Sequence, residues 1–405
     1  MAISHTNSIG FAPSMNDAEH GVVVADRVAI PAEKGDAHLQ LSAACTAEPR
    51  AGAIAIIGAG NAARSLACYL ARQGYSSQLL VRSPHKVTAL MERLRITSRG
   101  QLEGEFEISK VSDDIESTLN KCRTVFVATT TDAYREIAFR LAPHLTPDHE
   151  VILFSSKFAG AVEFKNVLSM AISDLPKIVE TDAIFASRIQ EDDSIWIRGI
   201  KKWTLYSSWN CTETERTAES ILRFFPELGR ADNIIQRGLT DFGALAHPIT
   251  MIANMNSVDR NTGFLFYYEG FTEKTIILME RLEEEFCALA EAFNTSLIPM
   301  KELLNQYYGC NTKSLLEAMR TVPNYSVSKA PGTLAHRFIE EDVASSMVPM
   351  QQLARKARVK TPIIDSIINI SAALLGRDFS TEGRSLAKLG WDHMSHEEIL
   401  QSIHA

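Results

Sequence analysis

Two segments in the C-terminal half of the chain carry side chains that could do acid–base chemistry. In residues 239–248, His247 is the only histidine among mostly apolar neighbours. A histidine side chain can both accept and donate a proton near neutral pH, although a lone histidine in such a stretch is more often a packed core side chain. In residues 336–343, Arg337 and Asp342 lie five positions apart. A short turn between them would let both side chains point into one cleft. The alternative is that they form a surface ion pair, which would contribute little to stability.

A glycine-containing turn near residue 58 has the pattern of a phosphate-binding loop. Residues 53–57 are an apolar run rich in isoleucine, glycines follow at positions 58 and 60, and apolar residues then recur at helical spacing. A strand, a tight turn and a helix in this order form the context of a dinucleotide fingerprint. Gly58 would allow the sharp turn, Gly60 would let the backbone approach a pyrophosphate, and the small Ala63 would allow close helix–strand packing. The free N–H groups of the helix N-terminus favour phosphate binding. We therefore predict dinucleotide contacts from Gly58, Gly60, Asn61, Ala62 and Ala63, the alternative being a glycine turn in another kind of α/β protein.

The end of the next predicted strand favours NADPH over NADH. Residues 77–81 have the pattern of a strand, and Arg82, Ser83 and Lys86 follow it. In dinucleotide-binding domains this position faces the adenosine ribose, where NAD enzymes place an acidic residue and an arginine suits the 2′-phosphate of NADP. No carboxylate competes at this point of the sequence. We predict that these three residues contact NADPH, the alternative being that Arg82 is an ordinary solvated arginine.

Two later strands end in small hydroxyl residues. The apolar run 124–128 is followed by Thr129 and Thr130, and the run 151–154 is followed by Ser155. Ligands of open α/β sheets bind outside the carboxyl ends of the strands. We therefore expect all three side chains at the cofactor site, with Ser155 toward the nicotinamide half. The threonines could instead cap the helix that follows them.

Composition and charge exclude several kinds of partner. The 405-residue chain has 45% hydrophobic residues, 22% charged residues and a net charge of −8, which is ordinary for a globular protein. It has no Lys/Arg cluster and no apolar run of ~18 residues, so we expect neither a nucleic-acid nor a membrane partner. Its six cysteines are scattered, which indicates reduced thiols in the cytoplasm, and no clustered ligand set predicts a metal site. The N-terminal residues lack the pattern of a secretory signal.

The hydrophobic pattern predicts an α/β fold with two folded domains after an N-terminal extension. Strands and helices alternate in the first domain, where residues 195–200 and 203–207 are expected to pair. In the second domain, apolar residues between Leu278 and Phe293 repeat at helical spacing. We place a flexible extension at residues 1–50, a domain that binds NADPH at 51–236 and a mostly α-helical domain at 237–405.

The order of these motifs resembles one family. A Gly-Ala-Gly-Asn turn at residues 58–61, then Ala-His-Pro around His247, then the segment from Arg337 to Asp342, is similar to the opine dehydrogenases of the octopine dehydrogenase type. The same turn, together with Thr-Asp at residues 181–182, resembles still more closely the opine-metallophore branch, which includes staphylopine, pseudopaline and yersinopine dehydrogenases. The resemblance covers roughly residues 53–377.

What the resemblance implies is a Rossmann-type NADPH domain, a helical domain for substrate binding and dimerisation, and a reductive condensation. A primary amine attacks the carbonyl of a 2-oxo acid, water leaves, and hydride from the nicotinamide reduces the imine. By this resemblance His247 is the general acid/base. Asp342 fixes the tautomer of the imidazole, and Asp182 is a second candidate for that role. Arg337 would bind the carboxylate of the 2-oxo acid bidentately, and the protein would be a homodimer.

The metallophore branch implies a particular amine, an aminobutyrate-extended histidine, joined to pyruvate or 2-oxoglutarate. The product would be an opine-type metallophore, and the enzyme itself would need no metal. An opine dehydrogenase that uses a free amino acid is one alternative. A second is a two-domain 2-hydroxy/2-oxo acid reductase of the kind that uses a catalytic lysine. The third is an NADPH-sensing regulator, for which the acid/base group His247 would have no purpose.

Overall fold

The computed structural model describes residue 50 and residues 52–405, so the predicted extension at 1–50 lies outside the described part apart from Arg50. An eight-stranded sheet has the order β12-β11-β8-β7-β6-β1-β2-β5. The pairs from β8 to β5 are all parallel, whereas β11 runs antiparallel to β8. The strands are β1 (Ala53–Ile57), β2 (Ser76–Leu80), β5 (Lys110–Ser112), β6 (Thr124–Val127), β7 (Glu150–Phe154), β8 (Lys177–Thr181), β11 (Leu205–Ser207) and β12 (Gly229–Arg230).

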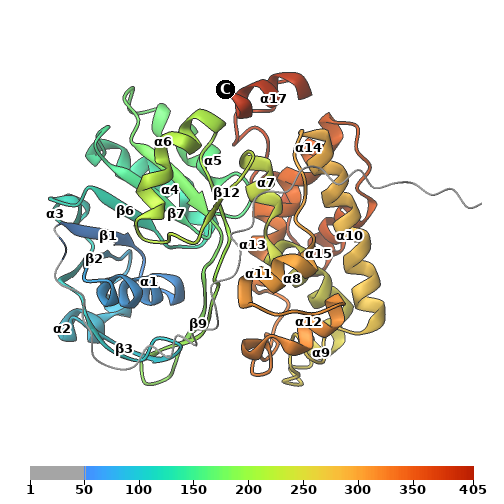
Figure 1. Cartoon of the computed structure of the whole chain (residues 1–405), viewed down its shortest axis with the longest axis horizontal. Coiled ribbons are helices and arrows are strands. Elements are labelled where there is room, and N and C mark those ends of the chain that lie inside the picture. The colour runs from blue at the N-terminus through green and yellow to red at the C-terminus, as the bar shows by residue number, and fades with distance from the viewer. Residues whose placement is uncertain (1–49, 51) are drawn as a thin grey trace, which may run out of the picture. The chain divides into compact units, whose positions relative to one another are not determined.

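Helices cover both faces of this sheet (Figure 1). Side chains alternate across a strand, so in β1 Ile54 and Ile56 pack on one face while Ala55 and Ile57 pack on the other. Helices α1 and α6 share the core of the first face, and α4 and α5 share that of the second. This arrangement confirms the predicted α/β class. The helices are α1 (Asn61–Arg72), α4 (Tyr134–Leu141), α5 (Gly160–Ser169) and α6 (Cys211–Leu222), with the short α2 (Thr88–Arg93) and α3 (Ile115–Leu119) between strands.

A second sheet of four strands has the order β4-β3-β10-β9. Residues 195–200 pair with β9 and β3, whereas 205–207 belong to the larger sheet. The predicted pairing between 195–200 and 203–207 is therefore wrong, because alternating apolar residues define a strand without selecting its neighbour. The strands are β3 (Arg95–Gly100), β4 (Gly104–Glu107), β9 (Phe185–Ile189) and β10 (Ile195–Ile200).

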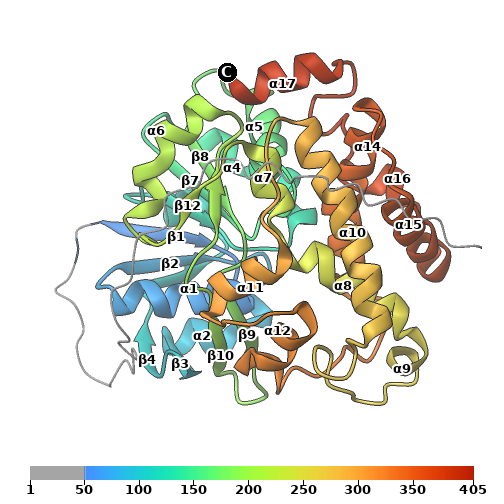
Figure 2. The same ribbon diagram turned by 45° about the vertical axis from the view of Figure 1, so that its right-hand side comes forward.

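The C-terminal part is helical, as predicted (Figure 2). Leu282, Phe286 and Leu289 of α10 are fully buried in a large apolar core, whereas Leu278 is 42% exposed. The predicted boundary after residue 236 falls inside α7 and stays a prediction. No helix of the described residues is long and apolar enough to cross a membrane. The helices are α7 (Ile234–Leu239), α8 (Phe242–Ala253), α9 (Met255–Asp259), α10 (Glu273–Ala292), α11 (Met300–Tyr308), α12 (Leu315–Thr321), α13 (Arg337–Asp342), α14 (Val348–Lys356), α15 (Pro362–Leu375), α16 (Phe379–Glu382) and α17 (His396–His404).

Candidate active site

A cavity of about 360 Å³ lies at the carboxyl ends of β1, β2 and β6. Gly58 has φ +121°, and a Cβ there would come within 2.8 Å of the carbonyl oxygen of Ala128, so only glycine allows β1 to turn this close to β6. Space above Gly60 is open, as the approach of a pyrophosphate requires. The predicted cofactor residues that line the cavity are Gly58, Gly60, Arg82, Ser83, Lys86, Thr129 and Thr130.

Four other predicted cofactor residues do not line this cavity. Asn61 begins α1, and its side-chain oxygen accepts a hydrogen bond from the backbone N–H of Ile189 at 2.9 Å. Ala62 and Ala63 pack against the core between α1 and the sheet, as the fingerprint requires of its third position. Ser155 follows β7, is buried and has φ +72°. Their contacts with a cofactor remain predictions.

His247 is held at both ring nitrogens. Helix α8 places it, and its Nδ1 lies 2.8 Å from Oδ2 of Asp342 while its Nε2 lies 3.0 Å from the hydroxyl of Tyr267. One face of the imidazole stacks on Phe338, with 3.8 Å between ring centroids. Asp241 precedes α8 and caps it, because its carboxylate accepts hydrogen bonds from the backbone N–H groups of the first turn. The position of His247 is therefore tied to a capped helix end. The side chain keeps 15% of its surface exposed.

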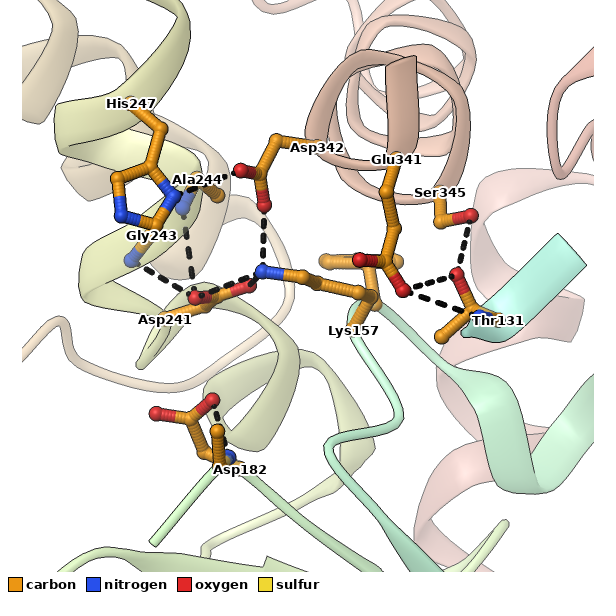
Figure 3. Close-up of polar contacts among 12 residues, drawn as sticks. Thr131, Lys157, Asp182, Asp241, Gly243, Ala244, His247, Glu341, Asp342 and Ser345 are labelled. Carbon is orange, nitrogen blue, oxygen red and sulfur yellow. Dashed lines mark hydrogen bonds and ion pairs between the residues drawn. The ribbon is translucent and has the colours of Figure 1, made fainter. Parts of the chain in front are cut away.

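The sequence did not point to Lys157, which joins this group from the other side (Figure 3). It follows β7, and its ammonium forms ion pairs with Asp342 and, at 3.1 Å, with Asp241. Its φ of +60° lies in the left-handed region, as do those of Ser155 and Ala159 on either side. Such backbone is unfavourable for residues with side chains and is held only where the surroundings enforce it. A lone charged residue in the loop after the apolar end of β7 is the signal that could have revealed it.

The charges in this group bias the protonation of its members. Burial alone would raise the pKa of Asp342, but Lys157 and His247 beside it lower that pKa well below its usual range. Asp342 is thus a carboxylate that can only accept hydrogen bonds, so Nδ1 of His247 carries a hydrogen and Nε2 is free to accept one from Tyr267. Although burial opposes its charge, the two aspartates raise the pKa of Lys157. Lys157 therefore stays protonated and keeps Asp342 ionised.

Arg337 and Asp342 occupy the same helix but contact different groups. Nη2 of Arg337 lies 2.7 Å from a carboxylate oxygen of Glu341, and the Arg337 side chain is 49% exposed. The other oxygen of Glu341 accepts hydrogen bonds from the backbone N–H and the hydroxyl of Thr131, at 3.0 and 3.2 Å. Arg337 lines a cavity of about 240 Å³ that shares Thr130 and Asp132 with the cofactor cavity. Its guanidinium is thus accessible from a space next to the cofactor cavity.

Asp182, the second predicted partner of His247, has a different set of contacts. It follows β8, pairs with Lys201 and accepts a hydrogen bond from the hydroxyl of Tyr307 at 3.2 Å. Burial would raise its pKa, but Lys201 and Lys157 lower it, so it is an ionised carboxylate. Figure 3 shows it away from the imidazole, which Asp342 contacts. Within the described residues, no group of three or more His, Cys, Asp or Glu side chains could hold a metal ion.

Two parts of the chain match known protein families. Residues 230–375 match the family described as "NAD/NADP octopine/nopaline dehydrogenase, alpha-helical domain", and residues 54–155 match "Ketopantoate reductase PanE/ApbA". An opine dehydrogenase of Arthrobacter sp. (strain 1C) is 26% identical over 86% of this chain and 98% of its own length. Protein ocs of Agrobacterium tumefaciens (strain Ach5) is 22% identical over the same shares.

Two solved structures have a similar fold. An octopine dehydrogenase with NADH and L-arginine superposes with a TM-score of 0.67 at 16% identity, covering 86% of this chain and 98% of its own. Yersinopine dehydrogenase gives a TM-score of 0.65 at 15% identity, covering 88% and 99%.

Fold, site and relatives together define an NAD(P)H-dependent oxidoreductase that acts on CH–NH donors. Its dinucleotide-type sheet is followed by a helical domain that is similar to that of octopine and nopaline dehydrogenases. These similarities support an assignment to the opine dehydrogenase family.

Proposed function

We propose that this protein joins an amino acid to a 2-oxo acid, using NADPH and His247 as the general acid/base. The observation that carries the proposal is the imidazole of His247 held between Asp342 and Tyr267. In overall balance, an amine, a 2-oxo acid, NADPH and a proton give a secondary amine, NADP⁺ and water. NADPH, when bound, supplies the hydride that reduces the imine.

The residues supply the proton transfers of this condensation. Nε2 of His247 can take a proton from the attacking amine and return one to the hydroxyl group that leaves as water. Asp342 stabilises the imidazolium formed between these steps, and Lys157 keeps Asp342 ionised. Tyr267 holds Nε2 until the substrate takes its place. Arg337, which can reach a neighbouring cavity, would bind the carboxylate of the 2-oxo acid.

The lining of the cofactor cavity supports NADPH as the cofactor. Arg82, Ser83 and Lys86 lie together at the β2 end of the cavity, where an arginine suits the 2′-phosphate. NADPH should therefore bind more tightly than NADH, and titration of both followed by nucleotide fluorescence measures this. Equal dissociation constants would contradict the assignment.

For the amine we propose a free amino acid. Two of the relatives that match over nearly their whole length are named opine dehydrogenase and Protein ocs, and the octopine dehydrogenase structure contains L-arginine. The aminobutyrate-extended histidine of the metallophore branch is the second candidate, favoured by the similarity to yersinopine dehydrogenase. We also expect a homodimer in the cytoplasm, which light scattering and fractionation would test.

Oxidation of NADPH in the presence of a panel of amines and 2-oxo acids tests the function. The panel contains free amino acids, the extended histidine, pyruvate and 2-oxoglutarate. We expect turnover only when an amine and a 2-oxo acid are both present, with a free amino acid as the better amine. Turnover with the 2-oxo acid alone would indicate a hydroxy-acid reductase instead. Tight NADPH binding without any turnover would indicate a regulator.

A further inference from the structure

Arg198 stands at an irregularity of β10. The register between β10 and β9 shifts between Ile197 and Gly199, so Arg198 is the residue without a partner on the neighbouring strand. Bulges of this kind re-aim a side chain and are common next to active sites. Gly199, the next residue, lies so close to Asn324 that a Cβ there would be 3.1 Å from its side chain. The bulge therefore lies against the segment that precedes α13, and Arg198 is part of it.

The guanidinium of Arg198 lacks an acidic partner within the described residues. Its Nη1 donates a hydrogen bond to the hydroxyl of Ser328 at 2.7 Å, and its buried Nε has no acceptor. The buried arginines of the described chain are different, since each is paired with a carboxylate at 2.5 to 2.7 Å: Arg64 with Asp193, Arg237 with Glu180 and Arg384 with Glu163. An arginine that is partly desolvated without an anion is costly, unless a ligand supplies that anion.

Arg198 is also a close neighbour of the catalytic group. The backbone N–H of Phe266 donates to the carbonyl of Ser328 at 2.8 Å, which places the next residue, Tyr267, beside the partner of Arg198. Tyr267 in turn contacts Nε2 of His247 at 3.0 Å. Burial lowers the pKa of Arg198, while Tyr267 and Tyr308 near it act in the opposite direction. The arginine thus lies one side chain away from the imidazole that is proposed to handle the protons.

We propose that Arg198 binds the carboxylate of the amino acid substrate and so selects amines with a carboxylate beside the amino group. This inference rests on the proposed function. The product of that reaction is a secondary amine flanked by two carboxylates, so the site needs two anion-binding groups. Arg337 is assigned to the 2-oxo acid, and Arg198 supplies the second cation from the opposite half of the molecule.

Substrate kinetics of Arg198→Gln test this assignment. A charge-assisted hydrogen bond is worth enough that we expect the KM of the amino acid to rise by about 10- to 100-fold. The KM of the same amine without its carboxylate should change by less than about threefold, as should the affinity for NADPH. Arg198→Lys, which keeps the charge, should restore part of the loss and guards against a folding defect in Arg198→Gln.

Two further variants separate the sources of the carboxylate. Arg99→Gln is the control: Arg99 lies on the adjacent strand β3, is exposed and pairs with Asp192 at 2.7 Å. This variant should leave the KM of both substrates and the affinity for NADPH unchanged. Arg337→Lys should raise the KM of the 2-oxo acid more than that of the amine. If Arg198→Gln instead raises only the KM of the 2-oxo acid, the assignment of Arg198 to the carboxylate of the amino acid is overturned.

The inference and the proposed function fail in different ways. If the wild-type enzyme turns over only with both substrates, two results of Arg198→Gln would overturn the role of Arg198. One is an equal rise in KM for the amino acid and its decarboxylated analogue, and the other is no change in either KM. Absence of turnover by the wild-type enzyme would overturn the function. In that case calorimetry with iminodiacetate, a secondary amine with two carboxylates, still tests Arg198, because Arg198→Gln should weaken its binding at least tenfold relative to Arg99→Gln. Equal binding to both variants would overturn the inference.

Discussion

At the scale of single residues, the imidazole of His247 has little freedom to rotate. Contacts of 2.8 Å with Asp342 and 3.0 Å with Tyr267 fix its two nitrogens, and Phe338 covers one face. A fixed ring presents the same nitrogen to every substrate, which is what a general acid/base requires.

Replacing His247 by alanine should therefore remove catalysis and spare the cofactor site. We expect turnover to fall by ~10²-fold or more, the usual loss for a general acid/base. The affinity for NADPH should stay the same, because His247 does not line the cofactor cavity. Steady-state kinetics and NADPH titration measure the two effects. Full activity in this variant would eliminate the assignment.

Lys157 should contribute to stability as well as to the charge of Asp342. Lys157→Met would leave Asp241 and Asp342 facing each other in the interior, where an unpaired buried charge is unfavourable. We expect the free energy of unfolding to fall by about 3–5 kcal/mol in urea denaturation. Asp241→Asn in the same chain should recover part of this loss by removing one charge. A loss below ~1 kcal/mol would show that the ion pairs do not hold this group together.

At the scale of secondary-structure elements, α13 brings Arg337 and Asp342 to the site and begins at an unusual cap. Nδ1 of His336 accepts a hydrogen bond from the backbone N–H of Phe338 at 3.2 Å. Burial, together with the neighbouring His247 and Arg337, lowers the pKa of His336 from 6.5 to about 4, although Asp342 and Glu341 act in the opposite direction. The ring is thus neutral in the folded protein at a pH where it is protonated in the unfolded chain.

This cap makes the stability of the protein dependent on pH. Between about pH 6.5 and pH 4 the unfolded chain binds more protons at His336 than the folded one, so the free energy of unfolding falls as the pH is lowered. His336→Asn keeps a capping oxygen but does not titrate, and its stability should fall less steeply over this range. Urea denaturation at several pH values compares the two proteins. Identical slopes would show that His336 does not shift as described.

The elements also show what sequence patterns can and cannot predict. The strand at 53–57 and the turn at Gly58 follow from local residue order, because a tight turn and close backbone approach need glycine there. The partner of residues 195–200 could not be predicted, since a period of two is the same for any neighbouring strand. Arg198 could not be predicted as a site residue for the same reason, since a bulge depends on the pairing of two strands.

At the scale of the whole molecule, the site is assembled from segments far apart in the chain. Lys157 comes from the end of β7 in the sheet, His247 from α8, and Asp342 from α13. His247 and Asp342 were predicted as partners through the resemblance to a family, and the structure places them in contact. Lys157 and Tyr267 reach the site because of how the sheet and the helices pack together. The spacing of residues in the sequence does not predict this packing.

The hydride acceptor tests the central claim most directly. The enzyme is given NADPH deuterated at the transferred position, a free amino acid and pyruvate, and the product is identified by mass spectrometry. We predict one deuterium on the former carbonyl carbon of a secondary amine that joins the two substrates, formed only when both are present. A deuterated 2-hydroxy acid, or any deuterated product formed in the absence of the amine, would contradict the account.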